Sequence, residues 1–178
     1  MTLTLVRHSE VIEEYQHCYN GHIDIPLSKK GFEDAKELGK KLKEIPFDAI
    51  YCSDLLRTKQ TLQSFNLPKQ NIIYTKELRE KSWGKHEGMS FDEIIASGLE
   101  YQNFEQWLEA LDGEDVDRYV KRIKNYLYNV IAKTQKENIL IVSHAGVIKT
   151  MIHITQKILL QEAFSTKLHY SSTFEIIL

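Results

Sequence analysis

Short apolar runs typical of buried strands alternate along the chain with longer stretches of helical periodicity. Runs rich in apolar and β-branched residues predict strands at 2–6, 47–52, 71–75 and 138–143, the last with the strongest pattern. Two further strands are predicted at 167–170 and 172–178, paired antiparallel at a sheet edge. Because strands alternate with helices, we expect a three-layer α/β/α sandwich around a mostly parallel central sheet.

The helical segments have recognisable ends. Helical spacing of apolar residues predicts helices over 29–45, over 91–111 as one or two short pieces, over 116–131 and from residue 147 onward. Ser28 is a candidate N-cap for the first of these helices, and Pro46 ends it. A further helix is expected to begin after the second strand, capped by Ser53 or Asp54, so that Arg57 falls in its first turn.

Length and composition narrow the class of protein. The chain has 178 residues, 42% hydrophobic and 27% charged, which suits one domain over 1–178 with a short lid insertion around 81–115. The net charge of −2 lacks the clustered basic excess of a nucleic-acid partner. No apolar run approaches the roughly 18 residues of a membrane span, and no signal-peptide pattern precedes Arg7. Cys18 and Cys52 follow no metal-binding or redox spacing, so we expect a cytoplasmic protein.

Charged and polar side chains follow the predicted strands at the points where those strands end. Arg7 and His8 follow the first strand, and His144 follows the strand at 138–143. The second strand leads to Arg57 within a few residues, and the third leads to Glu80. Since the carboxyl ends of parallel strands share one sheet edge, these groups are expected to converge there.

This combination of side chains suits phosphoryl transfer. Two arginines can neutralise a phosphate dianion through their rigid forks of donors, and the backbone N–H groups of Ala145 and Gly146 can add an anion site at a helix start. A neutral imidazole is a competent nucleophile, so His8 or His144 could accept the phosphoryl group. A protonated carboxyl at Glu80 or a neighbour could donate the proton to the leaving group.

The residues resemble the histidine phosphatase superfamily in its phosphoglycerate-mutase-like branch. The family opening R-H-G-E-T reads R-H-S-E-V here, and the S-H-G-G motif reads S-H-A-G. Five family motifs appear in the expected order, at 7–11, 21–31, 53–61, 78–88 and 143–146. Any one motif is weak evidence for the family, but the five together are specific and span nearly the whole chain.

The resemblance implies a role for each matching residue. His8 is the residue that would be transiently phosphorylated, with Arg7, Arg57 and His144 holding the phosphoryl group and Glu80 donating the proton. The resemblance implies the three-layer α/β sandwich and neither a metal ion nor an organic cofactor. The remaining candidates for substrate binding lie in loops or at the helix start near these motifs, and they are Asn20, Gly21, His22, Trp83 and Ala145.

Two positions depart from the family pattern in ways that matter. Ser9 replaces the family glycine, where a backbone angle reserved for glycine would be strained. Glu14 stands where the family often has an asparagine that contacts phosphate, and a carboxylate there would repel the dianion unless it points away. Ala145 for glycine is a mild change.

Alternatives remain for individual groups. Glu10, Glu77 and Glu87 compete with Glu80 as the acid. A zinc site built from histidines is conceivable, but it lacks a ligand motif such as H-E-x-x-H; its members would be His8, His17, His22 and His144.

Three functions fit this chain, and the first is a phosphomonoesterase that hydrolyses a phosphohistidine. The second is a phosphoglycerate mutase. The resemblance disfavours it, because mutases of the family have a larger insertion with an adjacent pair of arginines, whereas here no two arginines are adjacent and residues 89–117 form a short, acid-rich segment. The third is a non-catalytic phospho-ligand-binding module. The small size resembles α-ribazole phosphatases of the cobalamin pathway, with phosphoserine and broad-specificity phosphatases as alternatives. The C-terminal strand and residues 152–160 are candidate homodimer contacts.

Overall fold

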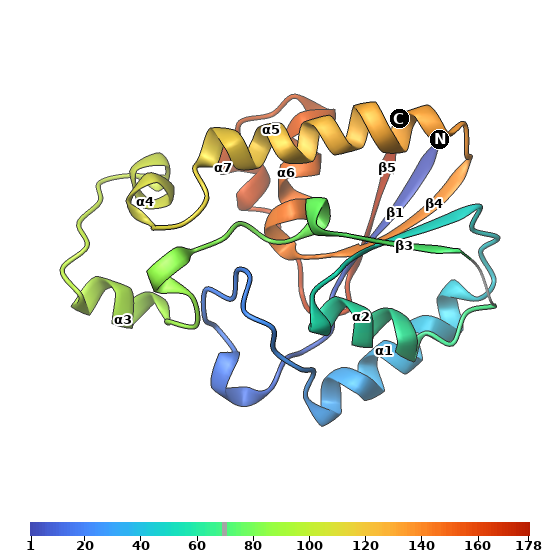
Figure 1. The fold of residues 1–178 in the computed structure, drawn as a ribbon, viewed down its shortest axis with the longest axis horizontal. Coiled ribbons are helices and arrows are strands. Elements are labelled where there is room, and N and C mark those ends of the chain that lie inside the picture. The colour runs from blue at the N-terminus through green and yellow to red at the C-terminus, as the bar shows by residue number, and fades with distance from the viewer. Residues whose placement is uncertain (69–70) are drawn as a thin grey trace.

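A twisted sheet forms the centre of the computed structural model, which describes residues 1–68 and 71–178 (Figure 1). Its strand order is β3-β2-β4-β1-β5. The strands are β1 (Thr2–Arg7), β2 (Ala49–Ser53), β3 (Ile72–Thr75), β4 (Asn138–Ser143) and β5 (Thr173–Ile177). All neighbouring pairs are parallel except β1 and β5, which run antiparallel. The predicted, mostly parallel sheet with one antiparallel edge strand is therefore confirmed.

Helices cover both faces of this sheet, as the three-layer prediction required (Figure 1). One face carries α1 (Lys29–Leu42) and α2 (Leu56–Ser64), and the other carries α5 (Val116–Tyr126), α6 (Ala145–Gln156) and α7 (Leu160–Phe164). Each face has its own buried apolar cluster. Burial of apolar surface between sheet and helices stabilises the fold by about 25 cal/mol for each Å² removed from water.

The segment at 81–115, predicted as a short lid insertion, lies beside this sandwich, at the left of Figure 1. It carries the short helices α3 (Phe91–Ala96) and α4 (Phe104–Ala110). A third apolar cluster, separate from the two that flank the sheet, packs these helices together; its buried members are Trp83, Ile94, Trp107, Leu108 and Leu111. Among the described residues, no helix is long and apolar enough to cross a lipid bilayer.

Several predicted boundaries are wrong for identifiable reasons. The predicted strand at 167–170 is irregular, because β5 alone fills the edge next to β1. Neither Ser53 nor Asp54 is the N-cap of α2; that position is Leu55, and the Leu56 N–H donates to Asp24 Oδ1. The carboxylate of Asp54 is instead engaged by the guanidinium of Arg79, with two N–O distances of 2.6 Å.

Helix ends also differ from the periodicity. Ser28 caps α1 as predicted, since its side chain accepts a hydrogen bond from Gly31 N, but the helix ends at Leu42 rather than at residue 45. The helix predicted over 116–131 is α5 followed by a π-helical turn over Leu127–Ile131.

Candidate active site

A cavity of about 170 Å³ opens at the carboxyl ends of the central strands. The structure brings together there the five side chains that the sequence marked for phosphoryl transfer: Arg7, His8, Arg57, Glu80 and His144. Three more of the predicted residues line the same cavity, namely Asn20, Trp83 and Ala145. The parallel sheet thus places groups far apart in the sequence around one space.

His8 stands directly after β1 and is oriented by its own main chain. Its Nδ1 lies 2.8 Å from the carbonyl oxygen of Ser9, so Nδ1 carries the hydrogen and donates it. The other ring nitrogen, Nε2, then keeps its lone pair. Burial, followed by the positive charges of Arg57 and Arg7, holds the pKa of His8 well below 6.5. The imidazole is therefore neutral at pH 7, as a nucleophile must be.

His144 occupies the N-cap position of α6 and faces His8 edge-on. The two ring centroids are 5.3 Å apart. Its Nε2 lies 2.9 Å from the hydroxyl oxygen of Ser53, whereas its Nδ1 is buried with no partner among the described residues. When Nε2 accepts from the hydroxyl of Ser53, Nδ1 carries a hydrogen. An unpaired buried donor beside the nucleophile is a suitable site for a phosphoryl oxygen.

Arg57 is buried, with only 1% of its surface exposed. Its guanidinium donates to the carbonyl oxygens of Asn20 (2.6 Å), Gly21 (2.8 Å) and Ile23 (2.9 Å), while its Nε has no partner in the described part of the chain. Burial lowers the pKa of Arg57 to about 10, which leaves the group charged at neutral pH. The arginine therefore fixes the loop at 20–23 and supplies positive charge to the cavity.

Arg7 is held from the C-terminal segment. Its Nη1 donates to the carbonyl oxygen of Leu168 at 2.6 Å, and its guanidinium carbon lies 4.1 Å from the centre of the Tyr170 ring. This distance is that of a cation–π contact. Nε of Arg7 is buried without a partner among the described residues. Both arginines thus keep a buried donor for an anion.

Glu80 presents its carboxyl group to the cavity and accepts three hydrogen bonds there. Oε1 accepts from the Tyr119 hydroxyl and from Lys81 N, both at 3.0 Å, and Oε2 accepts from Gly146 N at 2.8 Å. A Cβ atom at Gly146 would lie 2.2 Å from Oε1 of Glu80. The absence of a side chain at Gly146 is therefore what lets the carboxylate rest on the start of α6.

The competing carboxylates lie elsewhere. Glu87 accepts hydrogen bonds from the main-chain N–H groups of His22 and Ile23, each at 2.8 Å, and so organises a loop. Glu10 accepts from the hydroxyl of Ser28 at 2.7 Å. Neither of these carboxylates, nor that of Glu77, lines the cavity. Glu80 is the candidate acid that geometry favours.

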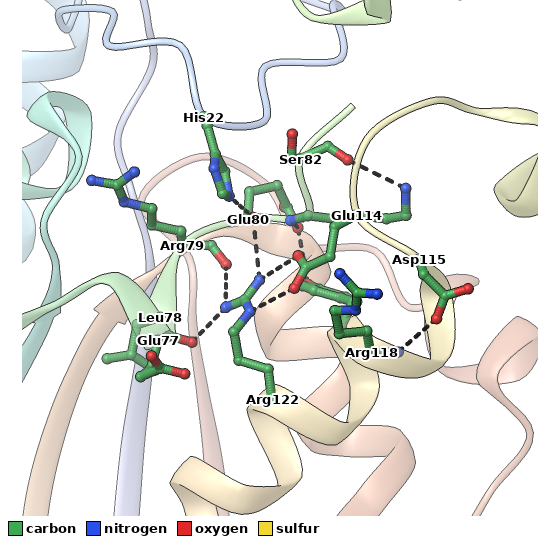
Figure 2. Close-up of polar contacts among 12 residues, drawn as sticks. His22, Glu77, Leu78, Arg79, Glu80, Ser82, Glu114, Asp115, Arg118 and Arg122 are labelled. Atoms are coloured by element: carbon green, nitrogen blue, oxygen red, sulfur yellow. Dashed lines mark hydrogen bonds and ion pairs between the residues drawn. The ribbon is translucent and has the colours of Figure 1, made fainter. Parts of the chain in front are cut away.

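Two residues expected to bind substrate support the site from behind its wall. Gly21 and His22 are not among the residues that line the cavity. The carbonyl of Gly21 serves Arg57, and His22 Nε2 lies 2.9 Å from the carbonyl oxygen of Glu80 (Figure 2). The prediction of direct substrate contact for Gly21 and His22 is therefore not supported by their placement.

The two departures from the family pattern are accommodated. The φ of Ser9 is not positive, so no glycine-only backbone angle is required there. Ser9 N donates to the hydroxyl of Thr61 at 2.9 Å. Glu14 is exposed in a short 3-10 turn, Glu13–Tyr15, and does not line the cavity. Its carboxylate therefore stands away from the place where a dianion would bind.

Sequence reasoning missed three cavity residues, Cys18, Tyr19 and Tyr170. Tyr170 belongs to none of the five motifs. It lines the cavity because the C-terminal segment packs on Arg7, where the Tyr170 ring contacts the guanidinium. Tyr119 lies on the buried face of the helix predicted over 116–131, and helical periodicity gave no signal for the bond of its hydroxyl to Glu80.

The described histidines do not form a metal-binding cluster. Within residues 1–68 and 71–178, no group of three or more His, Cys, Asp or Glu side chains lies close enough together to hold one metal ion. The four histidines considered for zinc thus do not form such a group there.

Comparison with known proteins defines the class. Residues 3–177 match the family described as Histidine phosphatase superfamily (branch 1), and the chain belongs to this superfamily, as its motifs predicted. It is 32% identical over 160 residues to the adenosylcobalamin/α-ribazole phosphatase of Salmonella typhimurium, covering 85% of this chain and 78% of that protein.

Two solved structures extend the comparison. The α-ribazole phosphatase from Shigella flexneri matches with a TM-score of 0.84 at 26% identity, covering 100% of this chain and 91% of that one. The phosphoglycerate mutase from Bacillus anthracis matches with a TM-score of 0.81 at 28% identity, covering 98% and 86%. Relatives of this chain therefore include both phosphatases and mutases.

Proposed function

We propose that this protein is a cytoplasmic, metal-independent phosphomonoester hydrolase that works through a phosphohistidine on His8. The observation that carries the proposal is the state of His8: a neutral imidazole whose Nε2 keeps its lone pair, in a cavity that Arg7, Arg57 and His144 also line. A nucleophile needs that lone pair, and the transferred phosphoryl group needs the surrounding positive charge.

The reaction would proceed in two displacements. In the first, Nε2 of His8 attacks phosphorus, the bond to the ester oxygen breaks, and protonated Glu80 gives its proton to the departing alkoxide. In the second, Glu80 takes a proton from water as the water oxygen attacks phosphorus, and the N–P bond breaks. Inorganic phosphate leaves, and both residues return to their starting states. Arg7, Arg57 and His144 hold the phosphoryl oxygens throughout.

Hydrolysis is favoured over mutase activity by the composition of the insertion. A phosphoglycerate mutase must hold a second anionic group of its substrate, beyond the transferred phosphate. The chain has no arginine between Arg79 and Arg118, and Trp83 is the residue by which the insertion lines the cavity. An aromatic wall suits an uncharged ring better than a second anion.

For the substrate we infer α-ribazole-5′-phosphate, with phosphoserine and other small phosphomonoesters as alternatives. Tyr19, Trp83 and Tyr170 line the cavity together with the groups that would hold phosphate. Aromatic faces at that place can stack on a base, and such stacking contributes about 1–3 kcal/mol. The relatives named α-ribazole phosphatase support the same inference.

A panel of phosphomonoesters tests the substrate. The value of kcat/KM is expected to be highest for α-ribazole-5′-phosphate, and Trp83→Ala should lower it about 10-fold while changing phosphoserine hydrolysis less than about 3-fold. Equal losses of kcat/KM on both substrates would show that Trp83 does not stack on the base. Rapid interconversion of 3-phosphoglycerate and 2-phosphoglycerate with 2,3-bisphosphoglycerate present would overturn the hydrolase assignment in favour of a mutase.

The catalytic proposal has its own test. His8→Ala should abolish both hydrolysis of an aryl phosphate and the acid-labile phosphoenzyme trapped from a labelled substrate. A variant that turns over near the wild-type rate would refute the nucleophile. Wild-type protein that binds phosphomonoesters without turnover would instead identify a binding module. Activity lost to a chelator and restored by zinc would contradict metal independence.

A further inference from the structure

Arg122 of α5 lies against the main chain that carries Glu80 (Figure 2). Its Nη1 donates to the carbonyl oxygens of Glu77 at 2.6 Å and Arg79 at 3.1 Å, and its Nη2 lies 3.5 Å from that of Glu80. One guanidinium therefore spans the segment at 77–80. A planar fork with fixed donor directions holds such a segment in one shape.

Glu114 fixes that guanidinium in turn. Its carboxylate accepts hydrogen bonds from Nε of Arg122 at 2.8 Å and from Nη2 at 2.7 Å. The side chains of Arg122 and Glu114 are only 16% and 13% exposed, respectively. The Glu114 N–H donates to the carbonyl oxygen of Ser82 at 3.0 Å. The end of the insertion is thus tied to the segment that follows Glu80 and, through Arg122, to the segment that precedes it.

Tyr119, nearly one turn earlier on the same helix, reaches the carboxylate itself. Its side chain is buried, and its hydroxyl donates to Oε1 of Glu80 at 3.0 Å. The guanidinium carbon of Arg122 lies 5.1 Å from the centre of the Tyr119 ring. Helix α5 therefore holds Glu80 at two levels, the main chain through Arg122 and the carboxylate through Tyr119.

We propose that Arg122 and Tyr119 are positioning residues for the proton transfer made by Glu80, with Glu114 orienting Arg122. The inference rests on the proposed function, in which Glu80 protonates the leaving group. Neither residue lines the cavity, so neither is expected to touch the substrate. Their effect is on the place of the carboxyl oxygens, and a displacement of about 1 Å in such a group can cost about 100-fold in rate.

Leaving-group dependence separates positioning from general support of the fold. An alkyl phosphate releases a strongly basic alkoxide and needs the proton from Glu80, whereas p-nitrophenyl phosphate releases a weakly basic phenolate and does not. Tyr119→Phe and Arg122→Met should each lower kcat/KM for glycerol 3-phosphate about 10- to 100-fold. For p-nitrophenyl phosphate the loss in kcat/KM should stay within about 3-fold, because kcat/KM reports the first displacement and not the later hydrolysis of the phosphohistidine, in which Glu80 acts as base for both substrates.

Matched controls come from the same helix. Arg118→Met removes an exposed arginine one turn from Arg122, and Tyr126→Phe removes the hydroxyl of a buried tyrosine that makes no bond to Glu80. Both variants should behave as wild type on both substrates. Tyr119→Phe keeps the ring that packs in the core, so this variant still tests the proposal if Arg122→Met does not fold.

Glu80→Gln distinguishes failure of this inference from failure of the proposed function. It should show the same selective loss on glycerol 3-phosphate. If it does so while Tyr119→Phe and Arg122→Met lose activity equally on both substrates, or lose none, the positioning inference alone is overturned. If Glu80→Gln shows no selectivity, Glu80 is not the acid and both proposals about it fall.

Discussion

The hydroxyl oxygens of Ser9 and Ser171 lie 2.6 Å apart, within hydrogen-bond distance. Ser9 stands where the family has glycine, and Ser171 has a left-handed backbone with φ of 57°. The bond joins the end of β1 to the loop whose Tyr170 ring packs on Arg7. Ser9, which departs from the family pattern, therefore has a structural role, because its hydroxyl helps to hold the Tyr170 wall of the cavity in place.

Ser9→Gly is expected to loosen that wall. The loss of one hydrogen bond costs about 1 kcal/mol, which corresponds to about a 5-fold higher KM for a phosphomonoester with kcat little changed. Steady-state kinetics measures both values. Ser172→Ala is the matched control, since the hydroxyl of Ser172 bonds to the carbonyl oxygen of His169 rather than to Ser9. A change in kcat without a change in KM would contradict the assignment.

Gly146→Ala should separate stability from activity. Alanine in place of glycine favours a helix by up to about 1 kcal/mol, but the new Cβ would meet Glu80 Oε1 at 2.2 Å. The carboxylate is the free end of a flexible side chain, so it moves and the fold stays. We expect a melting temperature near that of wild type and kcat on an alkyl phosphate about 10-fold lower. Full activity would show that the carboxylate position is not needed.

The neutral histidines make stability depend on pH. Burial and nearby arginines hold the pKa values of His8 and His144 well below 6.5. As the pH falls below about 6.5, the unfolded chain takes up protons that the folded chain does not, so the free energy of unfolding decreases. Each histidine accounts for about 1.4 kcal/mol of loss between pH 7.5 and pH 5.5 while it stays neutral in the folded state.

NMR titration measures this state directly. The imidazole resonances of both histidines should show no titration between pH 7.5 and 5.5 in the folded protein, and should titrate near 6.5 in urea. His8→Asn should make the free energy of unfolding less sensitive to pH over the same range. Titration of His8 near 6.5 in the folded protein would contradict the neutral nucleophile.

Arg57→Met is expected to damage folding as well as catalysis. It leaves the carbonyl oxygens of Asn20, Gly21 and Ile23 without the donors they have in the structure. Loss of these bonds should cost about 3 kcal/mol, or about 6–12 °C in melting temperature for a chain of this size. Arg118→Met, an exposed arginine, is the control. An unchanged melting temperature would show that the loop at 20–23 keeps its structure without the hydrogen bonds from Arg57.

Much of the fold and the site could be predicted from local pattern. The strand at 138–143 is fully apolar in its centre and is β4, and the helical stripe after Ser28 is α1. The five residues marked for phosphoryl transfer do line one cavity, because parallel strands bring their carboxyl ends to one edge. Their catalytic roles stay predictions until the variants are measured.

Tertiary structure decided what spacing alone left open. Glu80 and Glu87 belong to the same motif, and nothing in their order shows which of them lines the cavity. In the structure Glu80 lines it, whereas Glu87 accepts hydrogen bonds from the main-chain N–H groups of the loop at 22–23. The contacts of Arg122 and Tyr119 with Glu80 join residues about 40 positions apart, as the separations of 42 and 39 show. Hydrophobic periodicity specifies which face of a helix is buried, whereas the partner of a buried polar group depends on how distant segments pack.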